Sequence, residues 1–313
     1  MSFIGQLPSR LLSSIYYVTV TPFVAAFWFF IQIIPARAIS VFAPSIGRAL
    51  LFGRKKKVLE NMKQLLRHPE WNEQQWKKLW GRHINHLGST IVETMHYSKA
   101  SAGELQTKVT IHGAEQLRAC LRKGHGAVIL TNHIGNPGAV PLALALAGYH
   151  PIFAMNATPI QYLDLKVNQF LQRLGATRVR ADGAIALTVE EALHNNGVFA
   201  AVIDYSTTPN HTAWVRLGDA ELQVSLVPAT LALLCGSAIF SAIATPLGAG
   251  RYSISLRPLL PNTLESDVRE QALHMTVGAI RSMYEALLLD PEFWWRWDFP
   301  RIRPAGHESN QRA

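Results

Sequence analysis

Short apolar runs alternate with helical patterns between residues 108 and 289 of the chain. The two clearest runs are Ala127-Val-Ile-Leu-Thr131 and Gly197-Val-Phe-Ala-Ala-Val-Ile203, and each is followed by polar residues. Continuous apolar runs of this length are typical of strands that are buried on both faces of a parallel sheet. Because helical patterns separate the runs, the sequence predicts an α/β fold with a mixed, mostly parallel sheet flanked by helices.

The same pattern gives approximate bounds for the elements of this region. Strands are expected at 108–112, 127–131, 151–155, 175–180, 197–204, 238–244 and 252–256. Helices are expected at 114–123, 139–147, 161–174, 184–195, 227–234 and 266–289. A tryptophan-rich segment, Phe293 to Trp297, follows the last helix.

The first part of the chain has a different pattern, because residues 11 to 36 carry no charged side chain. The centre of this run, Ile15 to Ile34, is long enough as a helix to cross roughly 30 Å of hydrocarbon. Lys and Arg are concentrated after the run, which favours placing the rest of the chain in the cytoplasm. These features predict a membrane-anchoring helix, and a buried core helix is the alternative.

The segment that follows is helical in pattern and carries a basic cluster, Arg54 to Lys57. It also carries aromatic and apolar residues near helical spacing, a pattern more typical of core packing than of a functional site. Beside a membrane anchor, the same stripe could instead lie on the bilayer. The stripe consists of Trp71, Trp76, Leu79, Trp80, His83 and Leu87. The chain is therefore divided into a membrane anchor (1–36), a helical segment (37–105), an α/β domain (106–305) and a disordered tail (306–313).

Composition restricts the class of partner. The net charge of +9 over 313 residues favours a polyanionic partner, which is a nucleic acid, an anionic lipid surface or an acidic carrier protein. No zinc-finger spacing or RNA-binding motif is present, so nucleic acid is not expected. The two cysteines, Cys120 and Cys235, lack the spacing of a metal site, and no metal is expected. A serine hydrolase is disfavoured because no Gly-x-Ser-x-Gly turn occurs.

The two clearest strands end in side chains that suit acid–base chemistry. The first leads into His133 and the second leads directly into Asp204. Ligands of open parallel sheets gather outside the carboxyl ends of the strands, where a histidine can act as a general base. A carboxylate at the same edge could hold one ring nitrogen and leave the other free. Alternatively, His133 lies in an ordinary polar turn and Asp204 caps a turn.

The ordered set of motifs resembles the late acyltransferases of lipid A biosynthesis and the related phosphatidylinositol mannoside acyltransferases. Both groups belong to the glycerolipid acyltransferase superfamily, and the likeness extends over nearly the whole chain. It is carried by the apolar amino-terminal run, by Arg54 to Met62, Val109 to Leu117, Gly126 to Thr131, His133-Ile-Gly-Asn136 and the strand that ends at Asp204, and by Pro291 to Trp297.

One position departs from the family pattern. The family has an acidic residue five positions after the histidine, and this chain has Gly138 there. In the mannoside-acylating relatives a carboxylate at the end of a later strand serves the histidine, and Asp204 occupies the matching place. The resemblance therefore implies His133 as general base and Asp204 as its acidic partner. Loss of acyl transfer, with retained binding of lipid or carrier protein, is the alternative.

The resemblance implies direct transfer of a fatty acyl chain from acyl-carrier protein or acyl-CoA to a lipid or glycolipid, with no cofactor. Backbone N–H groups of the turn from Ile134 to Gly138 are the expected donors to the oxyanion. The expected location is the bacterial inner membrane, with the catalytic domain facing the cytoplasm. A membrane-tethered basic scaffold is a further alternative. The candidate substrate-binding residues are Gly135 and Asn136 in the histidine loop, Arg173 and Arg216 for an acceptor phosphate, and Arg178 and Arg180 for an acidic carrier.

Overall fold

The computed structural model describes residues 9–34, 39–156, 161–180, 185–205, 211–261, 267–298 and 301–306, and the side chains from residue 21 onward apart from 39 and 40. Residues 307–313, which make up nearly all of the predicted disordered tail, lie outside the described residues.

The centre of the molecule is a seven-stranded sheet with the order β1-β9-β8-β2-β5-β3-β4. All pairings in it are parallel except that of β8 with β9, which form an antiparallel hairpin. The predicted mixed, mostly parallel sheet is therefore confirmed. The strands are β1 (Val109–His112), β2 (Ala127–Thr131), β3 (Ile152–Ala154), β4 (Thr177–Val179), β5 (Val198–Val202), β8 (Ala238–Gly248) and β9 (Arg251–Leu259).

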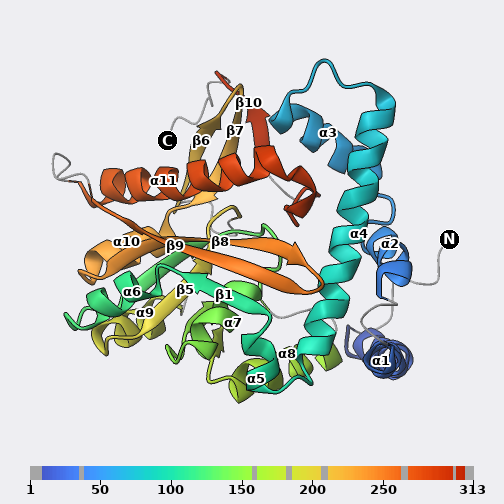
Figure 1. Ribbon diagram of the computed structural model, residues 1–313, viewed down its shortest axis with the longest axis horizontal. Helices are drawn as coiled ribbons and strands as arrows, with labels where there is room; N and C mark the ends of the chain where they lie inside the picture. Colours follow the sequence, from blue (N-terminus) through green and yellow to red (C-terminus); the bar gives the residue numbers. More distant parts are fainter. Residues whose placement is uncertain are drawn as a thin grey trace.

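Side chains of the central strands alternate between two apolar cores, one on each face of the sheet. In β2, Val128 and Leu130 belong to one core, whereas Ala127 and Ile129 belong to the other. Figure 1 shows α11 along one side of the sheet and α7 on the opposite side. The covering helices are α6 (Ala114–Leu121), α7 (Ala139–Leu146), α8 (Gln161–Arg173), α9 (Ile185–His194), α10 (Val227–Leu234) and α11 (Val268–Leu289).

A second, three-stranded antiparallel sheet was not predicted from the sequence. It has the order β10-β7-β6, formed by β6 (Thr212–Leu217), β7 (Ala220–Ser225) and β10 (Ile302–Pro304). Gly218, with φ of +60°, makes the turn between β6 and β7. The third strand comes from the C-terminal part of the chain, and such a distant pairing leaves no local pattern.

Helices α2 (Ile39–Leu50), α3 (Lys55–Leu66), α4 (Glu73–Tyr97) and α5 (Ala102–Gln106) precede the sheet. Figure 1 shows α4 standing across the ends of the strands, and Tyr97 of α4 contacts the turn between β8 and β9. Leu79 and His83 of α4 are fully buried, and most of the aromatic stripe joins the core that covers the sheet. Core packing, the first of the two interpretations of the stripe, is therefore confirmed.

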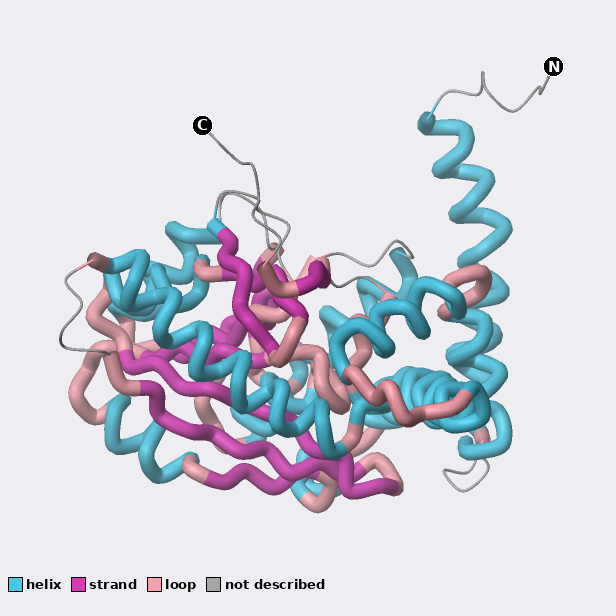
Figure 2. The backbone as a smooth tube through the Cα atoms, turned by 90° about the horizontal axis from the view of Figure 1, so that it is seen from above, coloured by secondary structure: helices cyan, strands magenta, loops and turns pink. Residues whose placement is uncertain are grey.

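The charge-free run forms α1 (Ser9–Ile33), which extends away from the body of the molecule in Figure 2. Among the described residues, no helix combines the length and the apolar character needed to cross a bilayer. The predicted transmembrane helix is therefore not found. Trp28 and Ile31 are instead buried against Val92 and Met95 of α4, so this face of α1 packs on protein.

Candidate active site

Strand register brings the predicted histidine and aspartate together. β2 pairs with β5 in parallel, and Thr131 lies opposite Val202. His133 and Asp204 each lie two residues after these partners, so both reach the same edge of the sheet. The sequence left open whether the two strands are neighbours, and the strand order shows that they are.

The Asp204 carboxylate is held at three points. Its Oδ1 lies 2.8 Å from Nδ1 of His133. Its Oδ2 accepts hydrogen bonds from the backbone N–H of His133 at 2.9 Å and from Nε1–H of Trp294 at 2.7 Å. The Asp204 side chain is fully buried, whereas 15% of the His133 side chain is exposed. Nδ1 therefore carries its proton toward the carboxylate, and the lone pair of Nε2 remains available.

Charge and hydrogen bonding keep Asp204 ionised despite its burial. Burial by itself raises the pKa of the Asp204 carboxyl group, but the His133 charge and the hydrogen bonds from His133 and Trp294 outweigh it. The net pKa of Asp204 is lower than its usual value. A buried carboxylate that stays ionised stabilises the imidazolium that forms when His133 accepts a proton.

The C-terminal segment holds the histidine loop from the other side. The short helix η4 (Pro291–Phe293) leads into Trp294, which pairs with Ile134 in an antiparallel bridge. Gly135 N–H donates to the carbonyl oxygen of Phe293, and Trp295 N–H donates to that of His133, both at 2.9 Å. Trp294 is fully buried, so the tryptophan-rich segment packs in the core.

Helix α4 supports the same loop through side chains. His86 Nε2 donates to the carbonyl oxygen of Gly135 at 3.1 Å, and Asn136 Nδ2 donates to Thr94 Oγ1 at 3.1 Å. Gly135 has φ of +68°, and a Cβ there would lie 2.3 Å from the carbonyl oxygen of Ala244. Glycine is therefore required at position 135 both by the backbone conformation and by the close approach of β8.

The free energy of unfolding is expected to fall as pH decreases from about 6.5 to about 4. Burial lowers the pKa of both His83 and His86 to about 4, so both are neutral in the fold while they protonate near pH 6.5 in the unfolded chain. At pH 5 the loss is ~2 kcal/mol for each histidine. Urea unfolding measured across this pH range checks the expectation.

The variant His86→Gln keeps a side-chain N–H for Gly135 but cannot titrate, so it should reduce the slope of stability against pH. The exposed residue His274 provides the control, and His274→Gln should leave the slope unchanged. An unchanged slope in His86→Gln contradicts the prediction.

Most N–H groups of the turn expected to bind the oxyanion already donate within the protein. Those of Ile134 and Gly138 donate to asparagine side-chain oxygens two residues before them. That of Gly135 donates to the C-terminal segment. Within the described residues, the N–H of Asn136 donates to no protein acceptor.

The predicted arginines do not join this site. Arg178 forms a bidentate ion pair with Asp164 at 2.7 and 2.8 Å and is largely buried. Arg180 is exposed just after β4, the edge strand of the large sheet, and Arg216 is exposed on β6 in the small sheet. Arg173 donates to carbonyl oxygens at the C-terminal end of α4. Within the described ranges, no three His, Cys, Asp or Glu side chains are grouped so as to hold a metal ion.

Comparison with known families decides what kind of protein carries this site. A sequence model described as bacterial lipid A biosynthesis acyltransferase matches residues 8–278, which is most of the chain. The chain belongs to this family. It is therefore an acyltransferase of lipid biosynthesis. No curated protein matches the chain significantly.

The family assignment makes Gly138 the notable position of the site. Its φ of −79° and ψ of −11° suit any residue, and a Cβ there would meet only Asn136 Oδ1 at 3.3 Å. The backbone therefore does not require glycine at position 138. The carboxylate beside His133 comes instead from the end of β5.

Three supporting residues of the site were not identified from the sequence. Trp294 binds the Asp204 carboxylate, His86 holds the Gly135 carbonyl group and Thr94 binds Asn136. Each comes from an element far from the histidine loop along the chain. The sequence offered two signs: the Pro291 to Trp297 segment contains Trp294, and His86 lies three residues after His83 of the aromatic stripe, on the same side of α4.

Proposed function

We propose that this acyltransferase moves a fatty acyl chain from the thioester of acyl-carrier protein or acyl-CoA to a hydroxyl group of a lipid or glycolipid. His133 serves as the general base and Asp204 as its acidic partner. The observation that carries the proposal is the 2.8 Å contact between His133 Nδ1 and the buried, ionised Asp204 carboxylate. It leaves the partly exposed imidazole with one basic nitrogen.

The reaction proceeds without a covalent enzyme intermediate. His133 Nε2 takes the proton of the acceptor hydroxyl group while the hydroxyl oxygen attacks the thioester carbonyl carbon. The N–H of Asn136 stabilises the oxyanion that forms. The tetrahedral intermediate collapses with cleavage of the carbon–sulfur bond, and the imidazolium returns its proton to the sulfur. The products are the acylated lipid and the free thiol of the donor, and no cofactor takes part.

The proposed location is the cytoplasmic surface of the bacterial inner membrane. Phe23, Phe29 and Ile33 of α1 expose 78%, 66% and 62% of their surface. Exposed apolar side chains in such numbers favour contact with lipid. The basic cluster Arg54 to Lys57 lies at the start of α3, and Lys55, Lys56 and Lys57 are exposed, as contact with an anionic surface or an acidic carrier requires.

One assay tests the proposed function against the non-catalytic alternative. The purified full chain is incubated with total membrane lipids and a radiolabelled acyl chain on either acyl-carrier protein or CoA. Label is expected to enter the lipid fraction from one or both donors. A chain that binds lipid or carrier protein but transfers no label from either donor is a binding protein, and the proposed function is then wrong.

The variant Gly138→Ala is expected to keep acyl-transfer activity within about threefold of wild type. A methyl group at position 138 meets only Asn136 Oδ1, which has to move by a few tenths of an ångström, and it leaves Asp204 in place. Initial rates at saturating donor provide the measurement. A loss comparable to that expected for Asp204→Asn would show that position 138, rather than β5, controls the histidine.

A further inference from the structure

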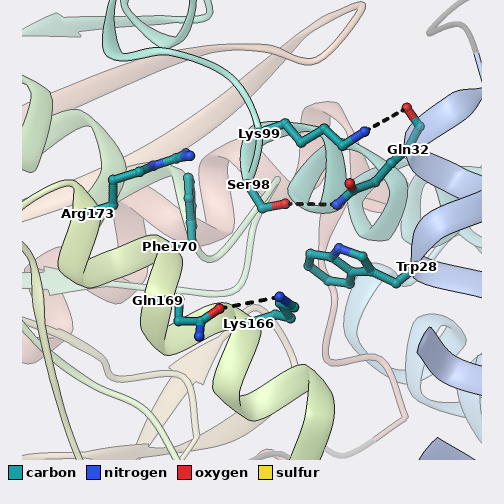
Figure 3. A pocket seen from close by; sticks show the side chains of 8 residues that line it. All are labelled: Trp28, Gln32, Ser98, Lys99, Lys166, Gln169, Phe170 and Arg173. Atoms are coloured by element: carbon teal, nitrogen blue, oxygen red, sulfur yellow. Dashed lines mark hydrogen bonds between the residues drawn. The ribbon is translucent and has the colours of Figure 1, made fainter. Parts of the chain in front are cut away.

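A polar cavity lies apart from the catalytic dyad, between α1, α8 and the C-terminal end of α4. Its volume is about 290 Å³, just below the range of roughly 300–1,000 Å³ for small-molecule sites. Figure 3 shows that Trp28 and Gln32 come from α1, with Ser98 and Lys99 beside Gln32. The remaining lining residues lie on α8 and are Lys166, Gln169, Phe170 and Arg173.

The lining of this cavity is positively charged and has no carboxylate. Lys99, Lys166 and Arg173 are three cations among eight lining residues. In the described part of the chain, neither lysine lies within ion-pair distance of an acid. The nearby acid of α8, Asp164, is engaged by Arg178 outside the cavity. The three positive charges around the cavity repel one another, and a bound anion offsets this electrostatic repulsion.

Neutral contacts hold these cations in place. Arg173 donates to the carbonyl oxygens of Tyr97 and Ala100 at 3.2 and 3.1 Å, where the helix dipole of α4 favours a cation. Lys99 Nζ donates to the Gln32 carbonyl oxygen at 3.3 Å. Lys166 Nζ donates to Gln169 Oε1 at 3.4 Å. Ammonium groups each have three donors, so both lysines keep N–H groups for a ligand.

Helix α1 carries both cavity-lining residues and exposed apolar residues that suit contact with lipid. Trp28 and Gln32 line the cavity, whereas their neighbours in sequence, Phe29 and Ile33, expose most of their surface. A ligand in the cavity would therefore contact the same helix that carries these exposed apolar side chains. An anionic group beside an apolar surface matches the chemistry of an amphiphile. A free anion has no apolar part that could contact Phe29.

We propose that the cavity binds the phosphate monoester headgroup of a membrane lipid. A dianionic phosphate ester suits three cations, and the space beyond the phosphate accommodates its glycerol or sugar. The proposal rests on the proposed membrane contact of α1 but not on the role of His133 and Asp204. It therefore adds an anionic lipid site to the acyltransferase, distinct from the histidine loop.

Flotation of the full chain with lipid vesicles tests the proposal without any acyl transfer. Three vesicle types are compared: phosphatidylcholine alone, phosphatidylcholine with phosphatidylglycerol, and phosphatidylcholine with phosphatidic acid at equal surface charge. The wild type is expected to bind phosphatidic acid vesicles most tightly. The double variant Lys99→Gln/Lys166→Gln should lose this preference, with binding to phosphatidic acid vesicles roughly thirty-fold weaker.

A matched control lies on α4, the helix that ends just before Ser98 and Lys99 of the cavity. Lys77 and Lys78 are exposed in the first turns of α4, and Lys77→Gln/Lys78→Gln changes the net charge equally while keeping the preference. Lys99→Arg/Lys166→Arg should also keep it, which separates loss of charge from misfolding. Equal loss in the control, or an unchanged preference in the double glutamine variant, overturns the proposal.

Two further outcomes decide the source of the phosphate. Glycerol 3-phosphate that displaces the protein from phosphatidic acid vesicles at concentrations similar to the lipid shows a site for a free phosphate ester, and the lipid assignment is then wrong. Equal, weak binding to all three vesicle types contradicts the membrane contact of α1 and, with it, this site. Neither result bears on the catalytic dyad, because no acyl donor is present.

Discussion

Replacing His133 by alanine is expected to lower the turnover number for acyl transfer by 10²–10⁴-fold. The imidazole is the basic group at the accessible edge of the dyad, and alanine leaves the acceptor hydroxyl with only water to take its proton. The fold should persist, because the backbone N–H of His133 still donates to Asp204. Steady-state transfer of labelled acyl chains to lipid, with donor and acceptor varied separately, measures the effect.

The control for this prediction is a histidine that precedes β2, whereas His133 follows it. His125 is exposed just before β2, and His125→Ala should transfer acyl chains at the wild-type rate. Equal activity of wild type and His133→Ala would remove the imidazole from the chemistry. A loss seen only as a higher KM, with an unchanged turnover number, would assign His133 to binding instead.

The central sheet and the dyad were predictable because both depend on short-range patterns. A continuous apolar run such as Ala127 to Thr131 specifies a buried strand, and the polar residue that follows it must lie at the carboxyl edge. Two strands with the same ending then place His133 and Asp204 at one edge. Their direct pairing did not follow from the pattern and required the strand order.

The parts that were not predicted depend on contacts between distant residues. The bond from Trp294 to Asp204 joins residues ninety positions apart, and β10 pairs with β7 across a similar separation. A tryptophan in a C-terminal segment looks the same in sequence whether it packs in a core or lies at a membrane surface. Its burial depends on contacts with Asp204 and Ile134, which only the folded chain brings together.

The prediction for the first helix shows the limits of hydropathy in a different way. The charge-free run does form α1, but hydropathy cannot tell which face of a helix will pack on protein. Trp28 is nearly buried, while Phe29 beside it is mostly exposed. The same helix therefore contributes to a protein core, to a cationic cavity and to an exposed apolar surface.

Asp204→Asn is expected to lower the turnover number by about 10⁴-fold, the loss typical of a histidine held in the wrong tautomer. The asparagine oxygen can take the place of Oδ2, which accepts from the His133 backbone and from Trp294. The asparagine NH₂ group then faces Nδ1 of His133, where Oδ1 now lies at 2.8 Å. A donor at that position forces the ring proton onto Nε2, so the lone pair needed for proton abstraction is lost.

Two measurements separate this tautomer effect from a structural one. The KM for the acyl donor should stay near its wild-type value, because the hydrogen bonds to the His133 backbone and Trp294 persist in Asp204→Asn. Trp294→Phe removes the Nε1–H that donates to the carboxylate but keeps an aromatic ring at this position. It should lower the turnover number far less than Asp204→Asn does. If Trp294→Phe is as inactive as Asp204→Asn, or if Asp204→Asn retains most of its turnover, the carboxylate serves only to build the loop and His133 acts without an acidic partner.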